Sequence, residues 1–280
     1  MQTPSTMRRN LIIFTLVTLS AGWVGAALDR AIATPDPQQG LGILLWILLP
    51  TVTGLLLRAV GGDGWQDAGF NPRLLAGWRW YGVALLLFPL ISLLLLGIGP
   101  VIGAFTLPGF ASQGIGAFLT LTAVAVLGSF GKNIFEEFAW RGYLTPRLAA
   151  LKVPRLRNHL LTGLIWAGWH LPYWLFFVDV RTFSTLSLPA FIALAMTTLV
   201  ITAITYGELR LWSGSVWPAV VLHSVANGVT ATFLLNGFVQ LNGGLGILFS
   251  PGNDGLVHSL LFALVGLAFY RYSRRTPSVL

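Results

Sequence analysis

Eight apolar stretches, each about 20 residues long, constrain the fold of this chain more than any other feature of its sequence. They cover residues 10–28, 41–57, 79–98, 117–140, 159–177, 189–207, 215–235 and 256–272. A helix needs about 20 mostly apolar residues to cross the hydrocarbon core of a bilayer. The stretches are too long and too evenly apolar for barrel strands. They therefore predict an all-α, polytopic membrane helix bundle with eight transmembrane helices.

Composition agrees with a membrane protein and excludes several other classes. Only 9% of the 280 residues are charged, against about 25% in a typical soluble domain. So few charges cannot cover a soluble surface, which excludes a cytosolic enzyme, a disordered tail and a nucleic-acid binder. The net charge of +8 then indicates basic residues that face anionic lipid headgroups. The chain has no cysteine, which excludes disulfides, thiol nucleophiles and cysteine-ligated metals.

The distribution of Lys and Arg between alternate loops predicts how the helices are oriented. One side of the bundle holds Arg30 and Arg181, and Lys132 lies inside the fourth stretch. Because basic loops stay in the cytoplasm, the remaining fourteen residues predict eight spans with both termini cytoplasmic. These fourteen are Arg8, Arg9, Arg58, Arg73, Arg79, Arg141, Arg147, Lys152, Arg155, Arg157, Arg210, Arg271, Arg274 and Arg275.

The first stretch has an alternative interpretation as a signal peptide. Arg8 and Arg9 precede it, and the sequence at 31–33 resembles a cleavage site. Cleavage would leave seven spans and an external amino terminus, whereas the distribution of basic residues needs no cleavage. We therefore expect a single integral membrane domain over residues 1–280, in a multi-pass protein of a prokaryotic cytoplasmic membrane.

Two of the three glutamates, Glu136 and Glu137, are adjacent near the cytoplasmic end of the stretch 117–140. Ionisable groups inside a span are costly and usually face a protein interior or a watery cavity. Glu137 and Arg141 are four residues apart on one helical face and can pair. Glu136 points about 100° away, free to face a cavity. We expect Lys132, one turn before Glu136, to extend to the lipid surface rather than to pair. The alternative is a salt-bridge cluster at the helix end.

Two histidines lie at depths similar to that of Glu136. His170 lies roughly 16 Å into its span, where Pro172 can kink the helix and open a pocket. His223 lies roughly 12 Å in, on the same helical face as Asn227, and Glu136 lies roughly 8 Å in. Polar groups on three helices in one layer predict a single site. The alternatives are a histidine bonded to a carbonyl of a neighbouring helix, and polar contacts that merely join helices.

These residues resemble the three motifs of the CPBP family of intramembrane proteases, also called the Abi or CAAX-protease family, which includes the Ras-converting CAAX endopeptidases. The resemblance covers residues 115–235, and it departs from the family at one place, where Trp stands instead of the commoner Phe. The motifs are Glu-Glu-x-x-x-Arg, an aromatic residue before a histidine, and His-x-x-x-Asn, matched here by Glu136, Glu137 and Arg141, by Trp166 and His170, and by His223 and Asn227.

The resemblance implies that the protein hydrolyses a peptide bond in a membrane-associated or lipid-modified peptide. By this likeness Glu136 and His170 activate a water molecule, with the carboxylate as general base. His223 and Asn227 donate hydrogen bonds to the oxyanion of the tetrahedral intermediate. The residues expected to support the site are Glu137, Arg141 and Trp166.

Metal dependence is the main chemical alternative. Glu136, His170 and His223 could hold a catalytic zinc ion, but the chain has no His-Glu-x-x-His motif, and Asn227 fits an oxyanion hole better than a zinc shell. We therefore expect a metal-free glutamate protease whose partners are a membrane peptide and the bilayer, not nucleic acid. The other functions considered are a non-catalytic scaffold or bacteriocin-immunity-type protein, and a proton-coupled transporter or channel.

Overall fold

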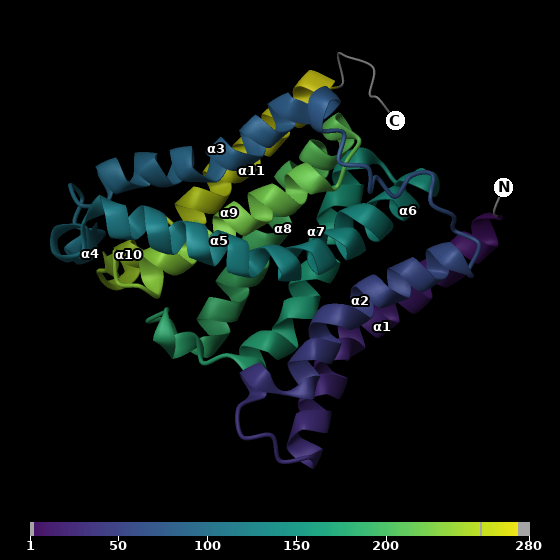
Figure 1. Cartoon of the computed structure of the whole chain (residues 1–280), viewed down its shortest axis with the longest axis horizontal. Helices are drawn as coiled ribbons and strands as arrows, with labels where there is room; N and C mark the ends of the chain where they lie inside the picture. The colour runs from purple at the N-terminus through teal and green to yellow at the C-terminus, as the bar shows by residue number, and fades with distance from the viewer. Residues whose placement is uncertain (1–2, 253, 274–280) are drawn as a thin grey trace.

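A computed structural model of the chain describes residues 3–252 and 254–273, and the regular secondary structure of these residues is helical apart from one short strand pair (Figure 1). Arg274 and Arg275, which contributed to the predicted orientation, lie outside the described residues. The main helices are α1 (Pro4–Ala31), α2 (Leu41–Ala59), α3 (Leu74–Ile98), α5 (Gly114–Ala139), α6 (Thr145–Ala150), α7 (Arg155–Pro172), α8 (Leu188–Ser213), α9 (Trp217–Leu234) and α11 (Leu256–Ser273). The short elements are α4 (Pro108–Ser112), α10 (Gly243–Phe249), the π-helical turns η2 (Trp140–Leu144) and η3 (Tyr173–Phe177), and the 3-10 turns η1 (Pro37–Gln39) and η4 (Val180–Thr182).

Each of the eight predicted stretches forms a helix, and five helices of the described chain are long and apolar enough to cross a membrane. These five are α1, α2, α3, the continuous helix Gly114–Ala150, and α8. The helix Leu256–Tyr272 is apolar but shorter, and polar side chains lower the hydropathy of α7 and α9. The protein is thus an integral, multi-pass membrane protein, and the eight-span topology stays a prediction.

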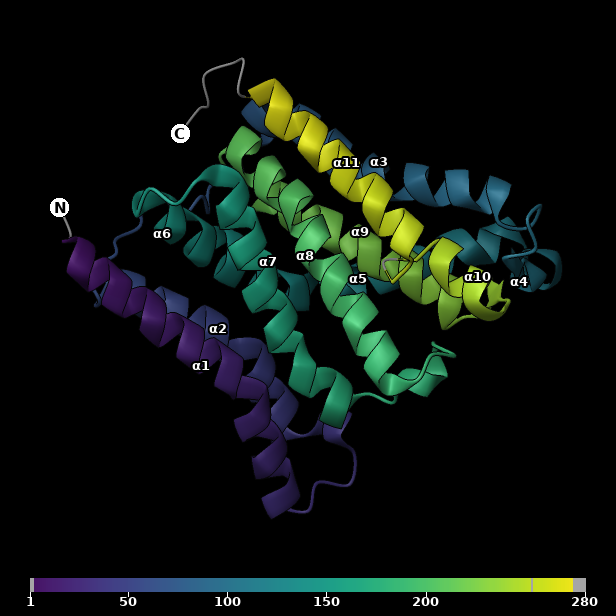
Figure 2. The ribbon, with the colours of Figure 1, turned by 180° about the vertical axis from the view of Figure 1, so that it is seen from behind.

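The helices pack in neighbouring pairs around a central group (Figure 2). In this centre α5 packs against α9, and α7 packs against α8. The hairpin of α1 and α2 covers one flank, where α1 contacts α7 and α2 contacts α5. On the other flank α3 lies on α9 and α11 lies on α8. The first turn of α1 and the last described turns of α11 lie towards the same side of the bundle (Figure 1).

A short antiparallel strand pair joins two loops on the side of the bundle opposite the last described turns of α11. It joins β1 (Phe105–Thr106), which follows α3, to β2 (Gln240–Leu241), which follows α9. Phe105 pairs with Leu241, and Phe105 is almost fully buried. The ladder therefore connects the outer helix α3 to the central helix α9.

The helix that carries both glutamates continues beyond them through η2 into α6, and two arginines from other helices hold this π-helical turn. A π-helical turn interrupts the regular α-helical bonding pattern and is frequent at functional sites. Arg210 Nε, from α8, donates to the carbonyl of Arg141 at 3.1 Å. Arg58, from α2, donates from Nε and Nη2 to the carbonyl of Gly142 at 3.1 and 2.5 Å. The end of the glutamate helix is thus fixed from two sides.

Candidate active site

Glu137 is fully buried and contacts two basic groups. Arg141 Nη1 lies 3.2 Å from its Oε1 and 3.1 Å from its Oε2, the i,i+4 pair that the sequence predicts. His223 Nδ1, on α9, lies 2.9 Å from the same Oε1. Since a carboxylate oxygen accepts, His223 carries a proton on Nδ1 in this contact. The Arg141 Cζ atom lies 4.7 Å from the ring centroids of both Trp166 and Tyr206, so Glu137 and Arg141 connect their own helix to α7, α8 and α9.

Glu136 is also paired, so the expectation that its carboxylate faces a cavity unpaired is wrong. Its Oε1 forms an ion pair with Lys132, and its Oε2 accepts a hydrogen bond of 2.9 Å from Trp166 Nε1. The expectation that Lys132 extends to the lipid surface is wrong for the same reason. A buried carboxylate without a cation is costly in a low dielectric, so a lysine within reach on the same helix pairs with it. Glu136 itself is 2% exposed.

Trp166 connects the two residues that are expected to activate water. Its indole N–H donates to Glu136, and its main-chain carbonyl lies 3.0 Å from His170 Nδ1. A carbonyl only accepts, so His170 carries its proton on Nδ1, and Nε2 is the basic nitrogen of the neutral ring. The Trp that departs from the family pattern therefore supplies an N–H that Phe lacks.

Aromatic rings surround His170 on α7. Its ring centroid lies 4.7 Å from that of Trp169 and 5.4 Å from that of Trp174, which is stacked on it. Trp169 and Trp46 exchange indole-to-carbonyl hydrogen bonds of 3.0 and 2.8 Å, which join α7 to α2. Regular α-helix ends at Pro172, and the chain continues as the π-helical turn η3. The carbonyl bonded to His170 belongs to its own helix, which differs from the alternative of a neighbouring helix.

Asn227 is held by a chain of side-chain hydrogen bonds between α9 and α5. Asn227 Nδ2 donates to Asn133 Oδ1 at 3.1 Å, and Asn133 Nδ2 donates to Ser224 Oγ at 3.1 Å. Asn133 and Ser224 are fully buried. His223 and Asn227 therefore do join helices, as the structural alternative supposed. They also line the cavity described next, so the two interpretations are compatible.

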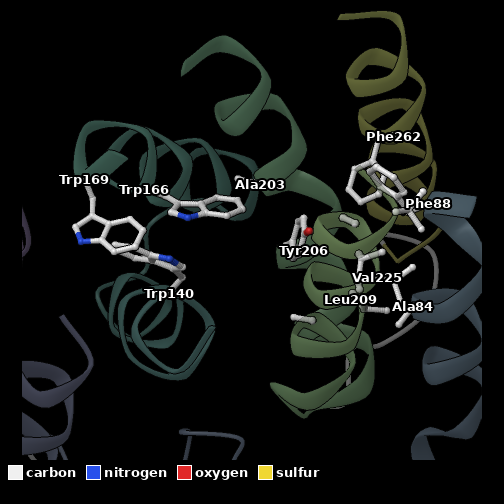
Figure 3. Close-up of a cluster of buried hydrophobic side chains, with 14 of the residues drawn as sticks. Ala84, Phe88, Trp140, Trp166, Trp169, Ala203, Tyr206, Leu209, Val225 and Phe262 are labelled. Carbon is white, nitrogen blue, oxygen red and sulfur yellow. The ribbon is translucent and has the colours of Figure 1, made fainter. Parts of the chain in front are cut away.

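His170, His223 and Asn227 line one cavity of about 460 Å³. Lys132 and Trp166 lie at the same end, while Glu136 lies behind them and does not form part of the wall. The remaining wall is mainly aromatic and aliphatic, with contributions from α2, α3, α5, α8, α9 and α11. Figure 3 shows Trp166 beside Trp140 and Trp169 at one end of the buried cluster, and Tyr206 between them and Phe88.

Tyr206 and Asn133 also belong to this site, although the sequence motifs do not include them. Tyr206 is 4% exposed and lines the cavity, with its ring 5.5 Å from Trp166 and 5.7 Å from His223. Nothing in the sequence marks a tyrosine at the end of an apolar stretch. Asn133 had a usable signal, because it stands four residues before Glu137 and so lies on the same helical face.

The donor set does not fit a zinc ion. Both Glu136 oxygens already face donors, an ammonium and an indole N–H, and the ammonium would repel a divalent cation. Among the described residues, no three His, Asp or Glu side chains lie together as potential metal ligands. No step of the chemistry below therefore involves a metal.

A family model matches the part of the chain that holds the motifs. Residues 118–229 match the family model described as type II CAAX prenyl endopeptidase Rce1-like. No curated protein matches the chain. The matched segment contains all three motifs and lies inside the range 115–235 that the motifs predict. This match supports the CPBP (CAAX-protease) family that the motifs predict.

Proposed function

We propose that the protein is an intramembrane endopeptidase that cuts a membrane-associated or lipid-modified peptide near the cytoplasmic surface of a prokaryotic membrane. The observation that carries this proposal is the common cavity of His170, His223 and Asn227, which belong to two helices. Glu136 lies directly behind Trp166 and is near enough to both histidines to act on them electrostatically. A cavity with a few convergent polar groups in an apolar wall is typical of a substrate site.

In the proposed reaction Glu136 and His170 together activate the attacking water. His170 lines the cavity. Its basic nitrogen is Nε2, since Nδ1 donates to the main-chain carbonyl of Trp166. Glu136 Oε1 becomes a proton acceptor when the Lys132 ammonium turns into the cavity, which that lysine also lines. Water loses a proton to this pair as its oxygen attacks the carbonyl carbon. The same proton then passes to the leaving amine when the C–N bond breaks.

His223 and Asn227 would stabilise the oxyanion that forms on the carbonyl oxygen. His223 Nδ1 is bonded to Glu137. Only a doubly protonated ring can therefore donate from Nε2 to an oxyanion at the same time. The amide of Asn227 is oriented by Asn133. Donors that are fixed before the reaction lower the barrier because they need no reorganisation.

The test is the substitution Glu136→Gln, which keeps the size of the side chain and removes the base. We expect kcat to fall by about 10²–10⁴-fold. Comparative membrane proteomics of cells with wild type or Glu136→Gln would identify a peptide that persists uncut, and the purified proteins would then be assayed on it. Glu208→Gln is the matched control, since Glu208 pairs with Arg155 and His159 at another helix contact. Undiminished turnover by Glu136→Gln would remove this residue from the mechanism.

The same variants separate an enzyme from a scaffold. A non-catalytic scaffold or immunity-type protein would complement a deletion equally well with Glu136→Gln or His170→Ala in place of wild type. An enzyme would lose complementation with both variants while the proteins still accumulate in the membrane at wild-type levels.

We also propose that the reaction needs no metal ion. The ion pair of Glu136 with Lys132 and its bond to Trp166 support this. Cleavage should be unchanged, within twofold, after dialysis against a strong chelator. Loss of activity that added zinc restores would contradict the proposal.

A further inference from the structure

The cavity has a second polar end, remote from the motif residues. Asp254, in the loop before α11, lines the wall there together with His258 and Ser259 on α11. His258 Nε2 lies 3.3 Å from Ser92 Oγ, and Ser92 donates to the carbonyl of Pro251 at 2.9 Å. The histidine and the loop are therefore held in place, and the wall between the two polar ends is largely apolar.

Asp254 differs from the glutamates of this chain in the kind of side chain that it contacts. Glu136, Glu137 and Glu208 each contact a basic side chain. Among the described residues Asp254 has no basic partner, and its Oδ1 accepts a hydrogen bond of 3.0 Å from Ser250 Oγ. A carboxylate beside an apolar cavity without a cation is unfavourable, and such groups usually serve a ligand.

Ser259 provides a second, independent observation at this end. Its side chain is fully buried, and its hydroxyl oxygen has no hydrogen-bond partner among the described residues. Buried hydroxyl groups are nearly always bonded, so the partner of this one is either an ordered water or a polar group of a bound molecule. A carboxylate and a hydroxyl together accept hydrogen bonds from an ammonium group.

We propose that Asp254 and Ser259 form a subsite for a positively charged amine of the substrate. The inference deepens the proposed function, because it assigns the substrate a cation at the end of the cavity remote from the scissile bond. A neutral apolar tail would leave Asp254 desolvated and unpaired, whereas an ammonium compensates its charge.

The helix α9 gives the distance between the two ends. The loop of Asp254 approaches α9 at Thr230 and Leu234, since a Cβ atom on Gly252 would lie 2.8 Å from Asp254 Oδ1, 3.0 Å from Thr230 Cγ2 and 3.3 Å from Leu234 Cδ1. These two residues lie roughly 10–16 Å along the helix from His223. An extended peptide advances about 3.3 Å per residue. The cation therefore lies about three to five residues from the scissile bond.

The test measures binding and needs no turnover. A brominated alkylamine and a brominated alcohol of equal chain length are titrated into the protein in zwitterionic nanodiscs, with tryptophan quenching as the readout. The cavity wall contains Trp46, Trp166 and Trp174, which report on its occupation. We expect the amine to bind about tenfold more tightly than the alcohol, because a charge-assisted bond exceeds a neutral one.

Variants of Asp254 distinguish an amine subsite from a purely structural role of this residue. Asp254→Asn should abolish the preference for the amine, Asp254→Glu should retain it, and Asp36→Asn should leave it unchanged because Asp36 lies in an exposed loop. A structural role at the start of α11 predicts lower stability of Asp254→Asn with the preference intact, and that result would overturn the proposal. Equal binding of amine and alcohol by wild type would overturn it as well.

The same titration in the Glu136→Gln background separates this inference from the proposed function. Retained amine preference with no cleavage activity supports the subsite independently of catalysis. If the preference is absent while wild type still cleaves peptides, the subsite is wrong and the protease proposal stands.

Discussion

The outer helix α3 and the central helix α9 pack against each other but differ in the polarity and the burial of their side chains. The helix α3 is the most apolar of the five candidate spans in the described chain, and it exposes a row of leucines such as Leu86, Leu90 and Leu93. The shorter α9 carries His223, Ser224 and Asn227 on buried or half-buried positions. The most apolar helix thus faces lipid, whereas His170, His223 and Asn227 lie on α7 and α9, which are not among the five candidate spans.

The contrast extends to how each helix is held in place. In α3 the contacts are mainly apolar, and single side chains face outward. In the centre every motif residue has a specific partner, such as Glu137 with Arg141 and His223. Removal of one member of an ion pair in the centre leaves a buried charge unpaired. Truncation of an exposed side chain on α3 exposes only a little more surface.

The largest effect on stability should come from Arg141→Leu. It leaves Glu137 buried beside His223 alone, and removal of one member of a buried ion pair typically costs about 3–5 kcal/mol. The control is Leu93→Ala, since Leu93 is 61% exposed on α3; there we expect a change within about 0.5 kcal/mol. Thermal unfolding of both variants in one detergent gives the comparison. Similar losses from the two variants would contradict the proposed difference between centre and periphery.

Trp166→Phe should lower cleavage more than stability. The variant keeps the ring but removes the N–H that bonds Glu136 Oε2. A lost hydrogen bond to a charged group is worth about 1.5–3 kcal/mol, which corresponds to roughly a 10–100-fold fall in kcat. Trp174→Phe is the control, because that ring stacks on His170 and Phe preserves stacking. An equal loss in both variants would mean that ring packing, not the indole N–H, matters.

The stability of the loop before α11 should depend on pH through Asp254. Burial raises the pKa of Asp254 above its ordinary value. Its contribution to stability is therefore fully present below the unfolded pKa of about 4 and is lost as pH rises through the folded pKa. The unfolding temperature of Asp254→Asn should therefore increase relative to that of wild type as pH rises from acid to neutral. A difference between the two proteins that does not change with pH would refute this.

The smallest effect is expected for Asp179→Asn. The exposed pair with Arg181 lowers the pKa of Asp179 to about 2, chiefly through the side-chain hydrogen bond. The pair therefore contributes above the ordinary pKa of this group, and the contribution is lost as pH falls towards 2. Because exposed ion pairs are weak, we expect no measurable change in unfolding temperature at neutral pH. A clear destabilisation there would show that this loop matters more than its exposure indicates.

The sequence alone predicted much of the fold because membrane helices leave a local signal. Every one of the eight stretches is helical in the structure, since backbone groups in hydrocarbon must bond within their own helix. The i,i+4 pair of Glu137 and Arg141 is local in the same sense. The resemblance to the family was also visible in the sequence, because its motifs are short patterns along the chain.

Only the tertiary structure decided which polar groups meet across helices. The bond of His223 to Glu137, the bond of Trp166 to Glu136 and the position of Tyr206 depend on helix rotation, which hydropathy does not specify. The pairing of Lys132 was misjudged because the sequence could not show that Glu136 is buried. A local pattern fixes where helices begin and end, but burial, which sets the energy of each charge, arises only when the helices pack.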